Sequence, residues 1–290
     1  MLIFNPLVYT MQEEFDLSVG MVILFIFFLP FIVVLIYIPF FYWNERGIFR
    51  SKLKKFKGNF DLKITTPIEK HFPFFNNLNS NYRHQFLERV HFFILNKNFV
   101  AREMDEVTDE MKAFIAGSAV QITFGFRPLV LAHFSTIYVH PDEYYNAFFK
   151  KSFKGETNVA GFIQLSWSDL VKGYAIPDNA INLGLHEMAH ALMVENEAFN
   201  EEYHFIAKRT LDEWHSISEP VFHKLNDGEV KVLRKYAGTN EHEFFAVCVE
   251  TFYENPVEFK NELPKLFNQL QKLLNFDPIN YKRIVEINEV

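Results

Sequence analysis

Residues 184–190 read GLHEMAH, so that His186 and His190 stand four positions apart and Glu187 directly follows the first histidine. On a helix, side chains four residues apart project from the same face. Both imidazoles can therefore reach one Zn²⁺ at about 2.0–2.1 Å. Glu187 lies where it can act as general base toward a zinc-bound water. The surrounding NLGLHEMAHALMVENE contains no proline and predicts a helix. The alternative is an ordinary helix with two partly exposed histidines and a solvated glutamate.

A catalytic zinc requires a third protein ligand and one open position. The HExxHxxGxxH pattern does not supply it, because Met193 replaces the glycine and Asn196 replaces the third histidine. Glu213 in TLDEWHS is at about the distance expected for a glutamate on the following helix, but its context is weak. The sequence also offers no convincing fourth ligand for a structural zinc site.

The stronger candidates lie in YAGTNEHEFFAVCVETFYENP, where Glu243 and Glu250 are seven residues apart and share one helical face. That face also carries apolar residues, and a carboxylate directed toward a core needs a cation or hydrogen bonds. Glu243 has an alternative role in a capping box with Asn240. Glu250 can instead hold a zinc-bound histidine or emerge into solvent.

Composition narrows the classes of function. The chain has 290 residues, 17% of them aromatic, and a net charge of −7, which argues against non-specific nucleic-acid binding. Its single cysteine, Cys248, excludes an intramolecular disulfide framework and fits a reducing compartment. Because Cys248 lies in the apolar run FFAVCVE, we interpret it as a core residue.

The N-terminal region predicts a membrane anchor. Residues 17–44 contain no charged residue, and residues 19–43 are long enough to span a bilayer as one transmembrane helix. Tyr42 and Trp43 fit an interfacial aromatic belt. Pro30 and Pro39 can kink the segment or turn it back. The alternative is a buried core helix.

Charge on the two flanks predicts the orientation. Acidic residues precede the apolar block and six Lys and Arg residues follow it between 46 and 57, which places the N-terminus outside and the large domain in the cytoplasm. We therefore expect a short extracytoplasmic N-terminus (1–18), a transmembrane helix (19–43), a basic juxtamembrane linker (44–71) that contacts lipid headgroups, and a catalytic domain (72–290).

Hydrophobic periodicity predicts an α+β domain, mostly helical with a small sheet. A helix is expected from Asp105 to about Ala119, strands at 120–126, 135–141 and 160–167, and mostly helix after Gly184. An amphipathic helix is expected through Phe259 to Leu273. The strand Phe162–Trp167 is either an exposed edge to which an extended substrate adds or an interior strand.

Five blocks in order give the chain a family resemblance: ITFGF, IYVHPDEY, GFIQLSWSDL, NLGLHEMAHALM and YAGTNEHEFFAVCVETFYENP. The chain resembles the Mlc titration factor A family of zinc peptidases and, more distantly, the catalytic domain of anthrax lethal factor. The resemblance implies a zincin-like fold, one Zn²⁺ per chain and Glu243 as third ligand. It also implies that Tyr236 stabilises the oxyanion. The apolar N-terminal block departs from this soluble family.

Together these features predict a membrane-anchored zinc peptidase. His186, His190 and Glu243 are its expected ligands, Glu187 its general base, and a peptide or protein its substrate. The resemblance also implies an alternative, in which the chain is a membrane-tethered protein that sequesters a transcriptional regulator. The two hypotheses differ in whether the protein needs Glu187 for its function: cleavage of a peptide requires it, whereas binding of a regulator does not.

Overall fold

The computed structural model describes residues 28–29, 34–35, 56–146, 150–198, 202 and 204–287. The predicted span over residues 19–43 lies outside the described residues except at those first four positions. No helix in the part of the chain that the structure describes combines the length and apolar character needed to cross a bilayer. Residues 54–290 form one compact unit, and this unit carries the site.

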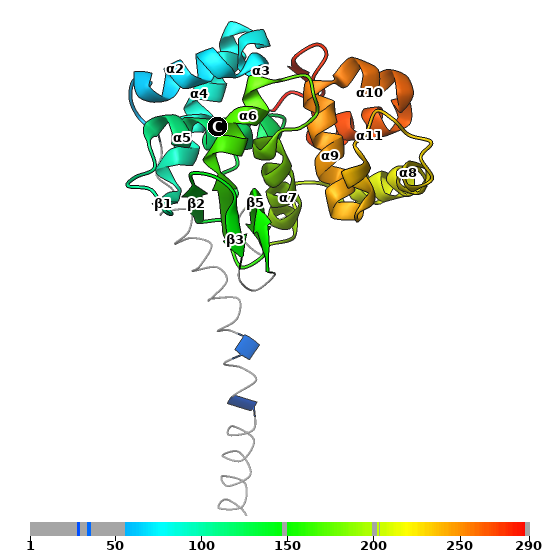
Figure 1. The fold of residues 1–290 in the computed structure, drawn as a ribbon, viewed down its shortest axis with the longest axis horizontal. Coiled ribbons are helices and arrows are strands. Elements are labelled where there is room, and N and C mark those ends of the chain that lie inside the picture. Colours follow the sequence, from blue (N-terminus) through cyan, green and yellow to red (C-terminus); the bar gives the residue numbers. More distant parts are fainter. Residues whose placement is uncertain are drawn as a thin grey trace, which may run out of the picture. The chain divides into compact units, whose positions relative to one another are not determined.

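A four-stranded sheet lies at one side of this unit, in the order β1-β2-β6-β5 (Figure 1). Its strands are β1 (Asn98–Ala101), β2 (Thr136–His140), β5 (Gly155–Asn158) and β6 (Phe162–Ser166). The first two and β6 are parallel, whereas β5 runs antiparallel to β6.

Strand β6 is therefore interior, and β5 forms the edge. The expectation of an exposed edge at Phe162–Trp167 is wrong, because β2 and β5 pair with its two sides. Ile163 and Leu165 are fully buried on one face of β6. Alternating apolar residues mark a face of a strand, not its place in the sheet, so the pattern did not separate the two cases.

Helix α7 (Leu183–Glu197) is central: it packs against α5 (Asp109–Thr123) on one side and α9 (Glu241–Glu254) on the other (Figure 1). The strand predicted at 120–126 is wrong, because α5 continues through Thr123. Every residue from Ala113 to Thr123 is buried. Burial on all sides of α5 outweighs the strand preference of its β-branched residues.

Residues 62–71 also differ from the prediction, because they form helix α2 (Leu62–His71) rather than the end of a linker. The side chain of Asp61 caps the helix by accepting a hydrogen bond from the Lys63 amide at 2.9 Å. Ile64 and Ile68, one turn apart, are buried, and α2 packs on α5.

The C-terminal half is helical, as expected. Helix α8 (Lys208–Asn226) and the short 3₁₀ helix η1 (Lys235–Gly238) precede α9. The single helix expected through Phe259–Leu273 is instead two helices, α10 (Pro256–Glu262) and α11 (Pro264–Leu274). Pro264 ends the first because it cannot continue its hydrogen bonding, and it starts the second at a position that tolerates proline.

The predicted class, α+β and mostly helical with a small sheet, is confirmed for the described residues. The remaining elements are α3 (Pro73–Asn77), α4 (Ser80–Leu95), α6 (Trp167–Ala175), the hairpin β3 (Tyr144–Asn146) and β4 (Lys151–Phe153), and the pair β7 (Phe276–Asp277) and β8 (Lys282–Arg283). Phenylalanine rings fill much of the core: Phe72, Phe86, Phe114, Phe124 and Phe276 are almost or completely buried.

Candidate metal centre

Helix α7 presents the two histidines of the motif to a cleft. The side chain of Asn182 caps the helix by accepting from the Leu185 amide at 3.1 Å. The opposite, apolar face is buried and includes Met188 and Leu192. This packing fixes the rotation of the helix, so that the side chains of His186 and His190 lie on the other face, 12% and 18% exposed.

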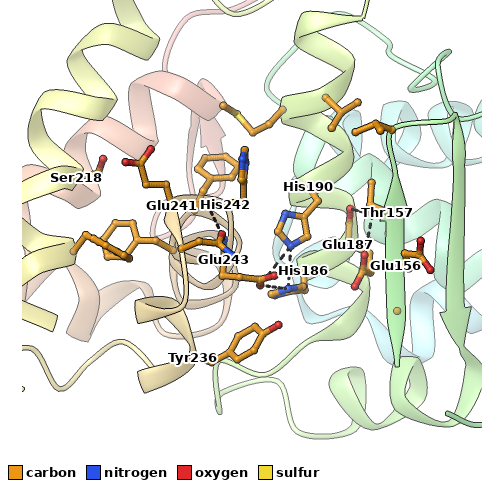
Figure 2. Close-up of a pocket in the computed structure, with 18 of the residues that line it drawn as sticks. Glu156, Thr157, His186, Glu187, His190, Ser218, Tyr236, Glu241, His242 and Glu243 are labelled. Atoms are coloured by element: carbon orange, nitrogen blue, oxygen red, sulfur yellow. Dashed lines mark hydrogen bonds and ion pairs between the residues drawn. The ribbon is translucent and has the colours of Figure 1, made fainter. Parts of the chain in front are cut away.

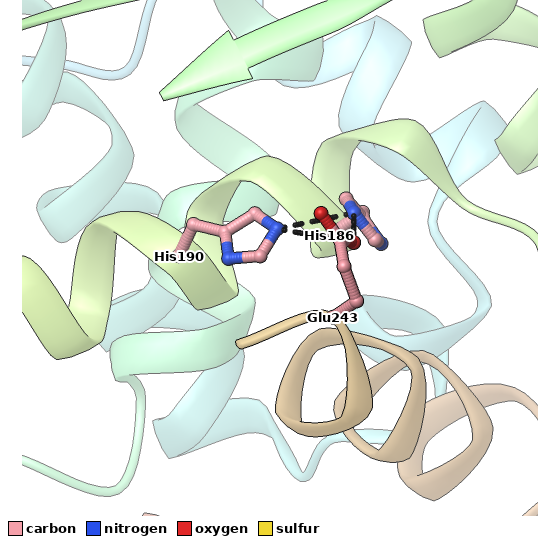
Figure 3. A group of neighbouring side chains, drawn as sticks. All are labelled: His186, His190 and Glu243. Atoms are coloured by element: carbon pink, nitrogen blue, oxygen red, sulfur yellow. Dashed lines mark hydrogen bonds and ion pairs between the residues drawn. The ribbon is translucent and has the colours of Figure 1, made fainter. Parts of the chain in front are cut away.

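Helix α9 brings Glu243 to the same point (Figure 3). Asn240 caps this helix through the amides of His242 and Glu243, while the Glu243 carboxylate extends to the two histidines. Its Oε2 lies 2.9 Å from Nε2 of His186 and 3.5 Å from Nε2 of His190. The two Nε2 atoms are 3.2 Å apart. Among the described residues, these three form the one group of histidine, cysteine and acidic side chains close enough to hold a metal.

The donor set fits a zinc ion. Ligand atoms at about 2.0–2.1 Å from a tetrahedral Zn²⁺ lie about 3.3 Å from one another, close to the 2.9, 3.2 and 3.5 Å observed. Glu243 Oε2 is buried and receives no hydrogen bond of ordinary geometry from the described residues. Two imidazoles and one carboxylate match the protein ligands of one class of catalytic zinc site, in which the fourth position is left for water.

Electrostatics at this point favour a cation. Burial lowers the pKa of the His186 imidazole, but the carboxylates of Glu243 and Glu250 outweigh it and raise that pKa to about 10. Burial has the opposite effect on a carboxylate and raises the pKa of Glu243, but His186 and His190 outweigh it and hold that pKa well below its usual range. The carboxylates that favour a proton on His186 equally favour a metal ion, which takes the proton's place when it binds.

Glu187 lies beside the cluster, on the side of β5 (Figure 2). Its carboxylate is buried, and burial raises its pKa more than the nearby histidines lower it. The Thr157 hydroxyl is 2.8 Å from Glu187 Oε2. A β-carbon at Gly155 would lie 2.4 Å from Glu187 Oε1. Strand β5 therefore gives the carboxylate both a hydrogen bond and the space it occupies.

Glu250 lies behind His186 and does not join the metal-ligating group. Its Oε1 accepts the Nδ1 proton of His186 at 2.7 Å, and its Oε2 accepts from the Asn182 amide at 2.7 Å. The guanidinium of Arg234 pairs with the same Oε1. The structure thus gives Glu250 a supporting position. It leaves Glu213 away from the cluster, paired with Arg209 on α8 at 3.0 Å.

Tyr236 stands at the mouth of the cluster, on η1. Its ring centroid is 6.0 Å from that of His186 and its side chain is half exposed. Burial and the neighbouring Glu243 raise the pKa of Tyr236 to about 12. The phenol is therefore protonated at neutral pH and is a hydrogen-bond donor.

The cluster opens into a cleft of about 820 Å³, whose lining also includes Glu187 and Tyr236 (Figure 2). Strand β5 and α7 form one wall, and residues of α8 and α9 form the other, including Ser218, Phe222 and Glu241. Sequence reasoning missed Gly155, Thr157 and Arg234. No motif marks GETN or the arginine, so nothing in the sequence pointed to their role at the site.

The chain is similar in sequence to several known proteins. A Synechocystis protein named "Uncharacterized protein slr2042" is 25% identical over 223 residues, which cover 71% of this chain and 81% of that protein. Mlc titration factor A from Salmonella agona is 27% identical over 136 residues, or 45% of this chain and 51% of the relative. The same-named protein from Yersinia pestis is 25% identical over 131 residues, 43% of this chain and 48% of the relative.

The alignments with Mlc titration factor A thus cover only about half of that protein. The sequence profile of a peptidase family covers much more, matching residues 48–274. This range holds the HEMAH helix, the β5 edge and the α9 glutamates. The chain belongs to the glucose-regulated metallo-peptidase M90 family.

Proposed function

We propose that this protein is a zinc-dependent peptidase that hydrolyses peptide bonds at the cluster of His186, His190 and Glu243. The observation that carries the proposal is the convergence of these three side chains, whose ligand atoms lie within 4.8 Å of one another. A buried glutamate, Glu187, lies directly beside them. A metal-binding site that only stabilises the fold does not need such a neighbour.

The protein's own groups divide the reaction between them. Zinc bound at the cluster would supply a water of lowered pKa and polarise the scissile carbonyl. Glu187 takes the proton of the attacking water and passes it to the leaving nitrogen. The Tyr236 hydroxyl donates to the oxyanion that develops on the carbonyl oxygen.

The position of strand β5 suits the binding of an extended peptide substrate. It is the last strand of the sheet and pairs with β6 alone among the described strands. Gly155, Glu156 and Thr157 line the cleft. Main-chain groups on an open strand edge can bind a peptide as an added strand, which would place its backbone beside Glu187 and the cluster.

The experiment uses the full-length chain purified in detergent. We expect about one zinc per chain by elemental mass spectrometry, and cleavage of fluorogenic peptides that a chelator abolishes and added zinc restores. The peptide library should include sequences rich in lysine and arginine, because exposed glutamates line the cleft: Glu197, Glu219 and Glu241. A well-folded protein without zinc, or cleavage that resists chelation, would contradict the proposal.

The alternative is a protein that binds a transcriptional regulator without cutting it. Both relatives from Salmonella agona and Yersinia pestis carry the name Mlc titration factor A, which links those proteins to Mlc. The peptidase is favoured for this chain because binding alone does not require a glutamate held against β5 beside the metal ligands. In either case the regulator is a partner to test by co-purification.

We further propose that residues 19–43 cross the membrane, with residues 1–18 outside and the catalytic domain in the cytoplasm. The absence of charge from 17 to 44 and the basic residues after it support this. In sealed cells, a membrane-impermeant thiol reagent is expected to label Glu13→Cys but to label Lys52→Cys only after permeabilisation. The native Cys248 is buried and gives little background. Equal labelling of both variants in sealed cells would contradict the orientation.

A further inference from the structure

Arg234 is a charged residue next to the cluster that the proposed reaction does not use. It stands two positions before Tyr236, immediately ahead of η1. Its guanidinium pairs with Glu250 Oε1 and lies 5.8 Å from the centroid of the Tyr236 ring. One side chain therefore touches both the acid behind His186 and the residue at the mouth of the cluster.

Glu250 needs that cation. Its side chain is 1% exposed, and a buried carboxylate is costly unless it is paired and hydrogen-bonded. It accepts hydrogen bonds from His186 Nδ1 and the Asn182 amide, each at 2.7 Å. A metal-bound His186 is neutral, so Arg234, which is always charged, is then the cation that pairs with Glu250.

The pairing of Glu250 also affects Nε2 of His186, the atom that would bind the metal. In the neutral, metal-binding form of His186 the Glu250 carboxylate accepts the proton on Nδ1, so Nε2 keeps its lone pair toward Glu243 and His190. The Asn182 amide fixes Glu250 relative to the first turn of α7. The guanidinium holds the same carboxylate from the side of η1. One arginine therefore pairs with the acid that meets His186 Nδ1 and also lies over the ring of Tyr236.

We propose that Arg234 is a positioning residue that, through Glu250, holds His186 in its metal-binding tautomer and also holds the turn that carries Tyr236. The second half of this inference rests on the proposed peptidase function. The first half concerns metal binding alone and can be measured without a substrate.

The test compares Arg234→Met and Arg234→Lys in the full-length chain in detergent. Lys235→Met is the matched control, since Lys235 is exposed in the same turn. The zinc dissociation constant is measured by competition with a chromophoric chelator. Loss of a partner that orients a ligand typically weakens metal binding about 10–100-fold, and we expect this for Arg234→Met. Arg234→Lys should recover part of the affinity, because it restores the charge but not the planar fork. Lys235→Met should match the wild type.

The kinetic arm is measured at saturating zinc. Arg234→Met is expected to lower kcat with little change in KM. That loss should shrink when Tyr236 is already Phe, because two residues that act together are not additive. The unfolding midpoint of the metal-free proteins distinguishes this positioning role from a merely structural one. A merely structural role would lower the midpoint and leave zinc affinity and kcat unchanged.

Wild-type zinc affinity in Arg234→Met would overturn the metal half of the proposal. An equal loss of kcat with and without the Tyr236 hydroxyl would overturn the other half. If Arg234→Met fails to fold, a Lys variant with wild-type zinc affinity and kcat would likewise overturn the proposal, because the guanidinium fork would then be dispensable. A wild-type protein that binds zinc but cleaves no peptide would defeat the proposed function and leave the zinc measurement valid.

Discussion

Glu187→Gln is expected to abolish peptide cleavage while leaving about one zinc per chain. The amide has nearly the same shape as the carboxylate but cannot take up the proton of the attacking water. General acid–base catalysis typically contributes about 10²–10⁴-fold, so we expect kcat/KM to fall about 10³-fold or more. Zinc should remain, because Glu187 stands beside the ligand group rather than in it. Cleavage rates and elemental analysis of the same preparation provide the measurement.

Glu156→Gln is the matched control. Glu156 also lines the cleft, but its carboxylate accepts from Asn158 at 2.8 Å and lies on the other side of β5 from Glu187 (Figure 2). The Glu156→Gln variant should cleave peptides at close to the wild-type rate. If Glu187→Gln retains substantial cleavage, the general base lies elsewhere. If it loses cleavage but still binds a regulator, binding and catalysis are separate activities of the chain.

Gly155→Ala tests the position of the same carboxylate instead of its chemistry. The added methyl would lie 2.4 Å from Glu187 Oε1, and the flexible end of the glutamate must move away. A displacement of about 1 Å in a catalytic group can cost about 10²-fold. We therefore expect a smaller loss of kcat than in Glu187→Gln, with zinc again retained.

The metal cluster shows what sequence can and cannot supply. Spacing alone placed His186 and His190 on one helical face, because the period of a helix is fixed. It left three glutamates open as partners, since the carboxylate that meets the histidines comes from a helix more than fifty residues later. The packing of α9 on α7 decides which glutamate turns toward the histidines, and that packing is a tertiary property.

The wrong predictions about the strands have a common cause. The stretch 120–126 resembles a strand because its residues are apolar and β-branched, yet burial on all sides keeps 109–123 helical. The strand at 162–166 was recognised but not its interior place, which depends on the short, polar β5. Gly155 and Thr157 on β5 gave no signal at all. Local patterns predict elements, whereas the partners of those elements depend on contacts between distant segments.

Removal of Glu243, the proposed third ligand, should have the largest effect on metal binding. Glu243→Ala leaves only two imidazoles, and Glu250 cannot replace the lost carboxylate because His186 Nδ1, Asn182 and Arg234 occupy it. Loss of a mere supporting partner weakens metal binding by up to about 100-fold, so loss of a ligand should exceed this. We expect purified Glu243→Ala to contain little zinc after dialysis and to cleave no peptide.

Glu241→Ala provides the control for this variant. Glu241 stands in the same first turn of α9 and lines the same cleft, but it is exposed and lies outside the ligand group. It should keep about one zinc per chain. Glu243→Ala with full zinc would move the third ligand to another residue, and Glu250→Ala would then be the variant to measure. Equal zinc loss in both variants would point to disruption of α9 rather than removal of a ligand, which the unfolding midpoints of the two proteins would reveal.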